Sequence, residues 1–253
     1  MAQGKHGTLY LVPAPLDFGS VPQPLGDAMP ERTLAVASGL THWICENAKT
    51  ARAYLKRIGE SHPLAAPLQE QRIAELPREV HKKGDHDGSF NAKPLLAAAL
   101  EGNDMGLLSE AGMPAVADPG SSVVRAAHEL DVPVVPLVGP VSLLLALAAS
   151  GLNGQNFAFV GYLPQDTAQR TQRIRELEAL ALKGQTQLFI ETPYRNIAMW
   201  EALVKSLQSG TRLAIASALT MPAEATLCRT ASKWRGQSCP LSNDVPAVFL
   251  IGK

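Results

Sequence analysis

The sequence lacks the excess of one charge, the cysteine spacing and the apolar signal core that would each indicate a broad functional class. Lysine and arginine together number 23, as do aspartate and glutamate, so no overall positive charge draws the chain to nucleic acid or to an acidic membrane surface. A local basic patch could still bind RNA. Cys45, Cys228 and Cys239 are odd in number and lack zinc or redox spacing, which predicts reduced thiols in a cytoplasmic protein. Residues 1–7 contain no apolar signal core.

The common signatures of phosphate, metal and hydrolase sites are also absent. There is no G-x-G-x-x-G fingerprint, no Walker A loop and no zinc-protease helix. Asp85, His86 and Asp87 faintly resemble the start of a calcium loop, but Gly88 comes too early and no bidentate glutamate follows where one is required. The histidines are scattered, and no G-x-S-x-G elbow accompanies them. We therefore expect neither a metal site nor a hydrolase triad.

Residues 132–152 have the length and the low charge of a membrane span. Their prolines argue against one. Pro133 and Pro136 suit an extended strand, and Gly139 followed by Pro140 marks a break before a short helix. The remaining helix is too short to cross a bilayer. We predict a strand, a tight turn and a buried helix, and no membrane association.

Strands and helices alternate along residues 1–152, which predicts an α/β domain with a largely parallel sheet. A chain of 253 residues that is 46% hydrophobic commonly forms two domains, and the segment 150–154 is the best boundary. The expected strands are residues 8–12, 42–45, 105–108 and 134–138. The expected helices are residues 31–38, 49–58, 70–79, 95–100, 121–130 and 140–149.

The second domain, residues 153–253, begins in the same way and then changes character. Strand 157–160, helix 167–182, strand 187–190 and helix 197–207 come first. Three strand-like segments follow with little helix between them, at residues 212–217, 225–228 and 247–251. This pattern predicts a mixed, partly antiparallel sheet.

A loop of small residues follows the strand expected at 105–108. Residues 109–120 read Ser-Glu-Ala-Gly-Met-Pro-Ala-Val-Ala-Asp-Pro-Gly. Glycine and alanine let backbone amides approach a ligand closely, and proline presets the curve of the chain. Alone, this loop could be an ordinary connection between a strand and a helix. Similar turns follow other expected strands, at residues 13–15, 139–142, 161–164, 191–195 and 245–247, so we interpret the set as ligand-cradling turns.

The order of these motifs resembles the tetrapyrrole methylase superfamily of methyltransferases that use S-adenosylmethionine (SAM). The resemblance is closest to the branch that methylates ribose 2′-hydroxyls of small-subunit ribosomal RNA. It runs from residues 7–12, Gly-Thr-Leu-Tyr-Leu-Val, through the loop at 111–120 to Glu191 and Arg195 of a Glu-x-Pro-x-Arg segment. Any one piece is weak, but the ordered set is specific.

The resemblance implies a two-domain α/β fold with SAM in the cleft between the domains, and a homodimer. SAM offers an adenine for an apolar slot, an amino-acid end for backbone hydrogen bonds and a sulfonium charge that a tight ion pair would quench. The residues that it implies as SAM contacts are Pro13, Met113, Pro114, Val116, Val141, Ser142, Tyr162, Leu163, Thr192, Pro246 and Ala247.

Methyl transfer from a sulfonium needs mainly alignment of nucleophile, methyl group and sulfur, and it requires no metal. A hydroxyl nucleophile would also benefit from a base, and motif position points to Glu46 and Glu191. Each has an alternative interpretation. Glu46 could be a carboxylate near a helix N-terminus, and Glu191 could form a salt bridge with Arg195.

The substrate side of the sequence departs from the ribosomal branch. Residues 46–49 read Glu-Asn-Ala-Lys where the branch has Glu-Asp-Thr-Arg, and Glu110 replaces the usual aspartate. A stretch rich in lysine and arginine is replaced by residues 165–170, although phosphate contacts normally need these side chains. The chain therefore resembles a divergent paralogue that kept its SAM scaffold better than its substrate side.

Three functions remain open at this point. RNA ribose methylation, with the small ribosomal subunit as partner, leads narrowly, and the candidate substrate contacts are Lys49, Arg52 and Arg195. Methylation of a small molecule, tetrapyrrole or otherwise, is the alternative that a neutral, apolar cleft would favour. The third is a SAM-binding protein without catalysis. A gathering of basic side chains at one mouth would favour RNA, and its members would be Lys49, Arg52, Lys56, Arg57, Lys82 and Lys83.

Overall fold

The structure is a computed structural model that describes residues 6–17, 23–83 and 89–253, without the side chains of residues 81–83. The chain divides into two compact units, Met1–Pro140 and Val141–Lys253. Each unit is described by itself. Asp85, His86 and Asp87, the faint calcium motif, lie outside the described residues, as do the side chains of Lys82 and Lys83.

The first unit is a parallel sheet of five strands in the order β3-β2-β4-β1-β5. Every pairing in this sheet is parallel, which confirms the predicted sheet type. The strands are β1 (Leu9–Val12), β2 (His42–Cys45), β3 (Arg72–Glu75), β4 (Met105–Leu108) and β5 (Val134–Pro136). The helices are α1 (Glu31–Gly39), α2 (Ala48–Gly59), α3 (Arg78–Lys83), α4 (Ala97–Leu100) and α5 (Ser121–Glu129), with short 3-10 turns at Leu25–Asp27 and Lys93–Leu96.

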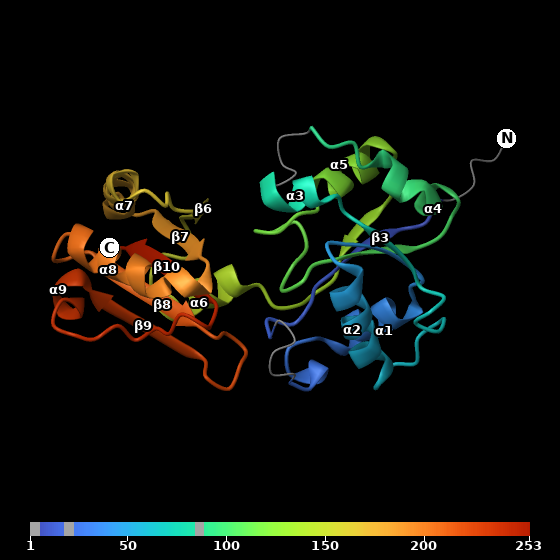
Figure 1. The fold of residues 1–253 in the computed structure, drawn as a ribbon, viewed down its shortest axis with the longest axis horizontal. Coiled ribbons are helices and arrows are strands. Elements are labelled where there is room, and N and C mark those ends of the chain that lie inside the picture. Colours follow the sequence, from blue (N-terminus) through green and yellow to red (C-terminus); the bar gives the residue numbers. More distant parts are fainter. Residues whose placement is uncertain (1–5, 18–22, 84–88) are drawn as a thin grey trace. The chain divides into compact units, whose positions relative to one another are not determined.

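Both faces of this sheet are covered, as its apolar strands require. Trp43 and Leu108 point into a core shared with α1 and α2. The neighbouring residues Ile44 and Leu107 point to the opposite face, into a core shared with α4 and α5. Figure 1 shows the two pairs of helices on opposite sides of the strands. Because successive side chains of a strand alternate between faces, short apolar runs supply both cores.

The prediction of a helix at residues 70–79 is wrong, because β3 occupies Arg72–Glu75 and α3 begins only at Arg78. β3 pairs with β2 at the edge of the sheet. The backbone N–H groups of Arg72 and Leu76 donate to the carbonyls of Thr41 and Cys45 at 2.9 and 2.8 Å. Buried Gln71 accepts a hydrogen bond from the Trp43 indole at 2.8 Å. These tertiary bonds outweigh the helix propensity of Arg, Ala and Glu.

The second unit is a mixed sheet in the order β6-β7-β10-β8-β9, as predicted. β6 runs parallel to β7, and the other pairings are antiparallel. Phe189 and Phe249 stack at 5.7 Å in the core that α7, α8 and α9 cover. The strands are β6 (Phe157–Tyr162), β7 (Thr186–Glu191), β8 (Arg212–Ser217), β9 (Ala225–Thr230) and β10 (Ala247–Gly252). The helices are α6 (Ser142–Ser150), α7 (Thr167–Leu182), α8 (Asn196–Ser206) and α9 (Ala231–Trp234), with a 3-10 turn at Pro193–Arg195.

The division between the units falls earlier than the boundary expected after Leu152. Helix α6 packs against β8, β9 and β10 and so belongs to the second unit. The glycine-rich segment after it starts with Gly151, whose φ of +71° gives α6 a left-handed C-cap. The segment that suggested a linker is therefore a helix end.

Residues 132–152 form β5, a turn and the nine-residue α6. Within the part of the chain that the structure describes, no helix combines the length and the apolar character needed to cross a bilayer.

Candidate functional site

The carboxyl ends of β2 and β4 form the switch point of the first sheet. These two strands are neighbours, yet the chain leaves β2 toward β3 on one side and leaves β4 toward β5 on the other. In open α/β sheets, ligands bind in the crevice where adjacent connections diverge in this way. Glu46 and Asn47 follow β2, and the small-residue loop at 109–120 follows β4.

The loop at 109–120 is tied to the loop that follows β1. Ala14 and Gly112 exchange two backbone hydrogen bonds, each of 2.9 Å. The Ser109 hydroxyl donates to the Gly112 carbonyl at 2.6 Å. Ala115 and Ala117 both have φ of +62°, a conformation that is costly for residues with a Cβ. Such strain persists where surrounding bonds hold it, and it concentrates at functional sites.

The predicted turn at 139–142 contacts the loops after β1 and β4 at the same edge of the sheet. Gly139 lies so close to Pro13 that a Cβ at position 139 would come within 2.3 Å of the proline Cγ. A Cβ on Gly112 would lie 3.5 Å from the Pro140 carbonyl oxygen. The turns at 13–15, 109–119 and 139–140 are therefore packed together, and only small residues permit it. They carry four of the predicted SAM contacts, namely buried Pro13 and Pro114, half-buried Met113 and exposed Val116.

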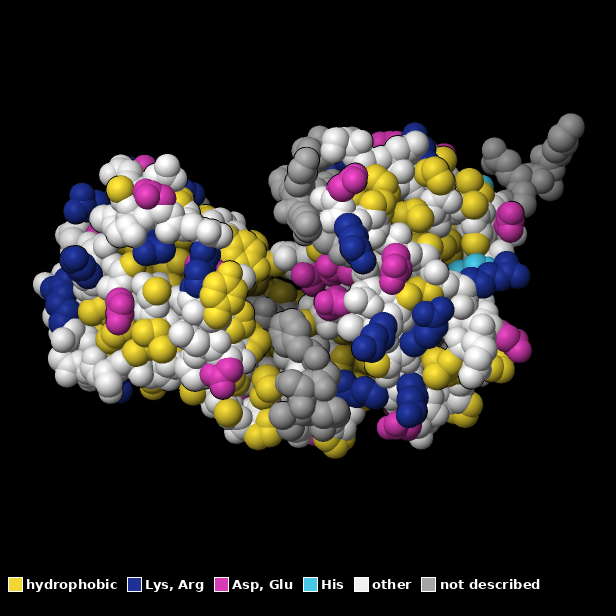
Figure 2. Space-filling view, viewed as in Figure 1, with side chains coloured by type: hydrophobic (Ala, Val, Ile, Leu, Met, Phe, Trp, Pro, Cys, Tyr) yellow, Lys and Arg dark blue, Asp and Glu magenta, His cyan; other side chains and the backbone are white. Residues whose placement is uncertain are grey.

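At this edge of the first sheet, the charges of two carboxylates affect the pKa of a third. Burial, followed by the negative charges of Glu46 and Glu110, raises the pKa of Asp118 to about 7. Figure 2 shows a group of acidic side chains on the first unit. A carboxyl with a raised pKa at a ligand-binding edge is typical of catalytic acids and bases. The motif containing Asp118 was visible in the sequence, but the burial and the two charges come from separate strands, so sequence reasoning assigned Asp118 no role.

Glu46 is half-buried and precedes the N-cap of α2. The cap itself is Asn47, whose side-chain oxygen accepts from the N–H groups of Lys49 and Thr50 at 2.9 and 3.4 Å. The carboxylate of Glu75 accepts from the Ala48 N–H at 2.6 Å. The first backbone N–H groups of the helix therefore donate to Asn47 and Glu75, and not to Glu46. Its role as a base stays a prediction.

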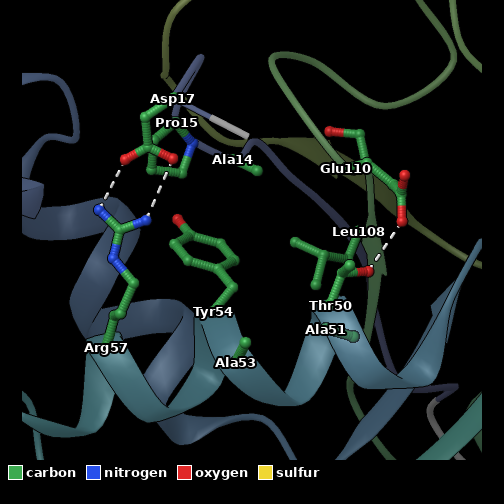
Figure 3. Close-up of a pocket in the computed structure, with 11 residues that line it drawn as sticks. Ala14, Pro15, Asp17, Thr50, Ala51, Ala53, Tyr54, Arg57, Leu108 and Glu110 are labelled. Atoms are coloured by element: carbon green, nitrogen blue, oxygen red, sulfur yellow. Dashed lines mark hydrogen bonds and ion pairs between the residues drawn. The ribbon is translucent and has the colours of Figure 1, made fainter. Parts of the chain in front are cut away.

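A cavity of about 130 Å³ lies beside α2, between the loop after β1 and the end of β4. We call it the α2 cavity (Figure 3). Arg57 forms two hydrogen bonds with Asp17, at 2.8 and 3.2 Å, at one end of it. Thr50 lies 2.8 Å from Glu110 at the other end, and Tyr54 stands between them. The Tyr54 hydroxyl donates to the Pro13 carbonyl at 3.0 Å, and burial raises the pKa of this phenol.

Exposed basic side chains lie on another face of α2. Lys49, Arg52 and Lys56 are spaced three and four residues apart, which places them on one face of the helix. We call these three residues the basic stripe. Figure 2 shows lysine and arginine side chains gathered over this region. Two of them, Lys49 and Arg52, are predicted substrate contacts, whereas Arg57 is held by Asp17.

The predicted SAM contacts of the second unit gather mostly at one edge of its sheet. Tyr162 pairs with Ile190, and Ala247 pairs with Glu191, so the ends of β6 and β7 and the start of β10 coincide. Leu163, Thr192 and Pro246 adjoin these strand ends. Asn196 ties the edge together, because its amide donates to the Val245 carbonyl at 2.8 Å. Val141 and Ser142 begin α6, as its N-cap and first residue.

Glu191 forms the salt bridge that was one of its two interpretations. Its buried carboxylate accepts two hydrogen bonds from Arg195 Nη2, at 2.6 and 2.7 Å. It also accepts the backbone N–H of Thr192 at 2.7 Å. These bonds occupy both oxygens and orient Arg195 and the turn. The catalytic role of Glu191 stays a prediction.

Across residues 6–17, 23–80 and 89–253, no three His, Cys, Asp or Glu side chains lie together as a metal ligand set. Burial, with the charge of Glu75 next, raises the pKa of the Cys45 thiol to about 12, so this thiol is held protonated.

Comparison with known proteins gives the family from the sequence and the same fold from solved structures. Residues 35–233 match the family of Tetrapyrrole (Corrin/Porphyrin) Methylases. A protein named ribosomal RNA small subunit methyltransferase I from Escherichia coli O157:H7 is 30% identical over 219 residues, which cover 87% of this chain and 68% of that protein. A protein of the same name from Mesorhizobium japonicum is 33% identical over 212 residues, or 84% of this chain and 63% of that protein.

Two solved structures share the fold at low sequence identity. The uroporphyrin-III-C-methyltransferase from Thermus thermophilus is 20% identical with a TM-score of 0.51, and the match covers 98% of this chain and 92% of that one. The methyltransferase CobJ is 19% identical with a TM-score of 0.57, covering 98% and 94%. The chain spans about two thirds of the two sequence relatives and nearly the whole of both solved structures. From its two sheets, its small-residue turns and the family match over residues 35–233, this chain belongs to the tetrapyrrole methylase family.

Proposed function

We propose that the protein is a SAM-dependent methyltransferase that acts on RNA of the small ribosomal subunit. The observation that carries the proposal is the match of 84–87% of the chain to two proteins named for that activity. Family membership alone supports methyl transfer. The RNA substrate goes beyond what family membership supports, because the match spans only part of those relatives.

The small-residue turns fit SAM as the methyl donor. At Gly139 a side chain would collide with Pro13, and Gly112 exchanges two backbone hydrogen bonds with Ala14, so glycine lets the turns pack closely at both positions. Met113, Pro114 and Val116 would supply apolar contacts in the first unit. Thr192, Tyr162 and the start of β10 would supply them in the second.

Asp118 is our candidate for the base that takes the proton from a hydroxyl nucleophile. A general base works best when its pKa lies near the working pH, and the pKa of Asp118 is about 7. Glu46, the base proposed from the sequence, contributes to that pKa through its charge. In this assignment the Asp118 carboxylate would accept the proton of the attacking hydroxyl, and bound SAM would supply the methyl group.

The basic stripe on α2 supports RNA as the acceptor. The chain has no net charge, so attraction to phosphates must come from a local group of cations. Lys49, Arg52 and Lys56 are exposed on one face of one helix. Phosphate contacts of this kind position an RNA without reading its sequence.

The test is transfer of labelled methyl groups from SAM to small ribosomal subunits that lack the modification. We expect incorporation by the unaltered protein, and at least about a 100-fold loss of rate in Asp118→Asn with SAM binding retained. Calorimetry with SAM and S-adenosylhomocysteine checks the binding. An Asp244→Asn variant, altered at an exposed aspartate of the second unit, serves as the control. Absence of incorporation with intact SAM binding would refute the RNA substrate and favour a small-molecule acceptor or a SAM-binding protein.

A further inference from the structure

We propose that the α2 cavity receives a base of the RNA acceptor and that Glu110 selects a base that carries an exocyclic amino group. The proposal rests on the RNA function proposed above and adds a specificity site to it. None of the predicted SAM contacts lines this cavity, so it is available beside a bound cofactor.

The walls of the cavity suit a flat ring. Ala14, Pro15, Ala51 and Leu108 give it small apolar surfaces, and its volume is about 130 Å³. Tyr54, from the middle of α2, adds an aromatic side chain (Figure 3). Unstacked bases of single-stranded RNA bind to surfaces that combine aromatic and apolar groups.

The charges around the cavity exclude a phosphate from it. Arg57 is the cation among its lining residues, and the two bonds to Asp17 neutralise its charge there. Arg57 Nη2 also donates to the Gln23 carbonyl at 2.9 Å. Glu110, at the other end, adds a negative charge next to Asp118. An uncharged ring edge is therefore the part of a nucleotide that fits.

Glu110 provides the hydrogen-bonding group that would read the ring. One carboxylate oxygen, Oε1, lies 2.8 Å from the Thr50 hydroxyl, which fixes the side chain. The other, Oε2, has no hydrogen-bond partner among the described residues. An ionised carboxylate only accepts hydrogen bonds, so it favours amino groups and rejects carbonyl oxygens. Adenine, cytosine and guanine carry an amino group on a base edge that proteins can contact.

The walls are held in place before any ligand binds. The Asp17–Arg57 pair joins the loop after β1 to α2, and the Tyr54 hydroxyl joins the same helix to Pro13. A site whose side chains are already fixed loses little entropy on binding and discriminates more sharply.

The basic stripe lies on the same helix as the cavity. Successive helical residues are turned by about 100°, so Ala53, which lines the cavity, lies between the face of Lys49, Arg52 and Lys56 and that of Thr50 and Tyr54. A single strand whose phosphates contact the stripe could therefore turn one base into the cavity.

The experiment compares binding of single-stranded oligoribonucleotides in which one base carries either an exocyclic amino group or a carbonyl at the same ring position. Cytidine with uridine, and adenosine with inosine, form two such pairs in an otherwise constant oligomer. Fluorescence anisotropy on the full chain should show about tenfold tighter binding of the amino-bearing member of each pair. In Glu110→Ala the ratio should fall to near one. In Thr50→Val, which frees Glu110, the ratio should fall partway.

The matched control is Glu60→Ala, which removes an exposed carboxylate just beyond the end of α2 and outside the cavity. Its ratio should equal that of the unaltered chain. The base-pocket proposal is wrong if the unaltered chain binds both members of each pair equally, or if Glu110→Ala keeps the preference. It is also wrong if Glu110→Ala abolishes SAM binding, because Glu110 would then be a cofactor contact. Failure of every oligomer to bind would instead refute the RNA function, and this site with it.

Discussion

At the scale of single residues, a few side chains at the carboxyl edge of the first sheet have properties set by their neighbours. The pKa of the Asp118 carboxyl is raised to about 7 because this side chain is half-buried next to Glu46 and Glu110. Gly106, inside β4, leaves no space above its Cα, since a Cβ there would lie 2.4 Å from Trp43. Each property yields a measurable consequence.

We expect the pH dependence of stability to carry the signature of Asp118. Between its ordinary pKa of 3.8 and its folded value of about 7, the folded protein keeps a proton that the unfolded chain has lost. The free energy of unfolding from this group therefore falls as the pH rises through this window, by roughly 2–4 kcal/mol in total. Urea denaturation at pH 5 and pH 8 measures it.

Asp118→Asn imitates the protonated carboxyl. The variant should therefore lose the pH-dependent part of the free energy of unfolding that Asp118 contributes. The variant should exceed the unaltered chain in stability at both pH values, and by more at pH 8 than at pH 5. If both proteins show the same slope with pH, then Asp118 does not have a raised pKa in the folded state.

Gly106→Ala should destabilise the first unit by about 2–4 kcal/mol, because the added methyl group overpacks a rigid site. The Trp43 ring cannot move away easily, since it is buried and its indole N–H is bonded to Gln71. Thermal unfolding measures the loss. Gly39→Ala is the control, because nothing lies within 4 Å of a Cβ at that position. Equal effects of the two changes would contradict this packing.

At the scale of elements, α2 combines several roles that its sequence spacing foreshadows. Its apolar residues Leu55 and Ile58 are fully buried, while the basic stripe faces solvent. Helical periodicity accounts for both faces. It could not predict that Arg57 turns to Asp17, because the partner comes from a loop 40 positions away.

Reversing the charge of the stripe should weaken RNA binding and its dependence on salt. In Lys49→Glu/Arg52→Glu/Lys56→Glu, the slope of log affinity against log salt should fall by about one per lost phosphate contact. Lys205→Glu, at an exposed lysine of α8 in the second unit, is the single-site control and should leave the slope unchanged. An unaltered slope in the triple variant would remove the stripe from the RNA interface.

β3 shows why periodicity can fail for a short element. Its end residues, Arg72 and Glu75, are polar and exposed, and only Ile73 and Ala74 are half-buried. An isolated stretch of this composition favours a helix. It becomes a strand because β2 presents an unpaired edge, and the backbone bonds to that edge exist only in the folded unit.

At the scale of the whole molecule, the chain is two units whose cores are built separately. The first core takes its residues from both faces of a parallel sheet, and the second from Phe189, Phe249 and the helices packed on them. Helix α6 covers the other face of the second sheet with buried Leu143, Ala146 and Leu147. The predicted SAM cleft between domains stays a prediction.

The placement of α6 predicts how fragments behave. A fragment of residues 141–253 should be more stable than one of residues 153–253, because the shorter one exposes the sheet face that α6 covers. Loss of three buried apolar side chains corresponds to about 4 kcal/mol or more. Urea unfolding of both fragments measures the difference. Equal stabilities would support the boundary after Leu152 instead.

The sequence by itself determined the fold class, the order of most elements, the family and the turns that would hold a cofactor, because these depend on local periodicity and on glycine and proline at fixed positions. Only the tertiary structure decided the strand at Arg72–Glu75, the membership of α6, the ion pair of Arg57 and the raised pKa of Asp118. Each of these depends on groups far apart in the chain. Their pairing energy and their burial do not exist until the sheet brings them together.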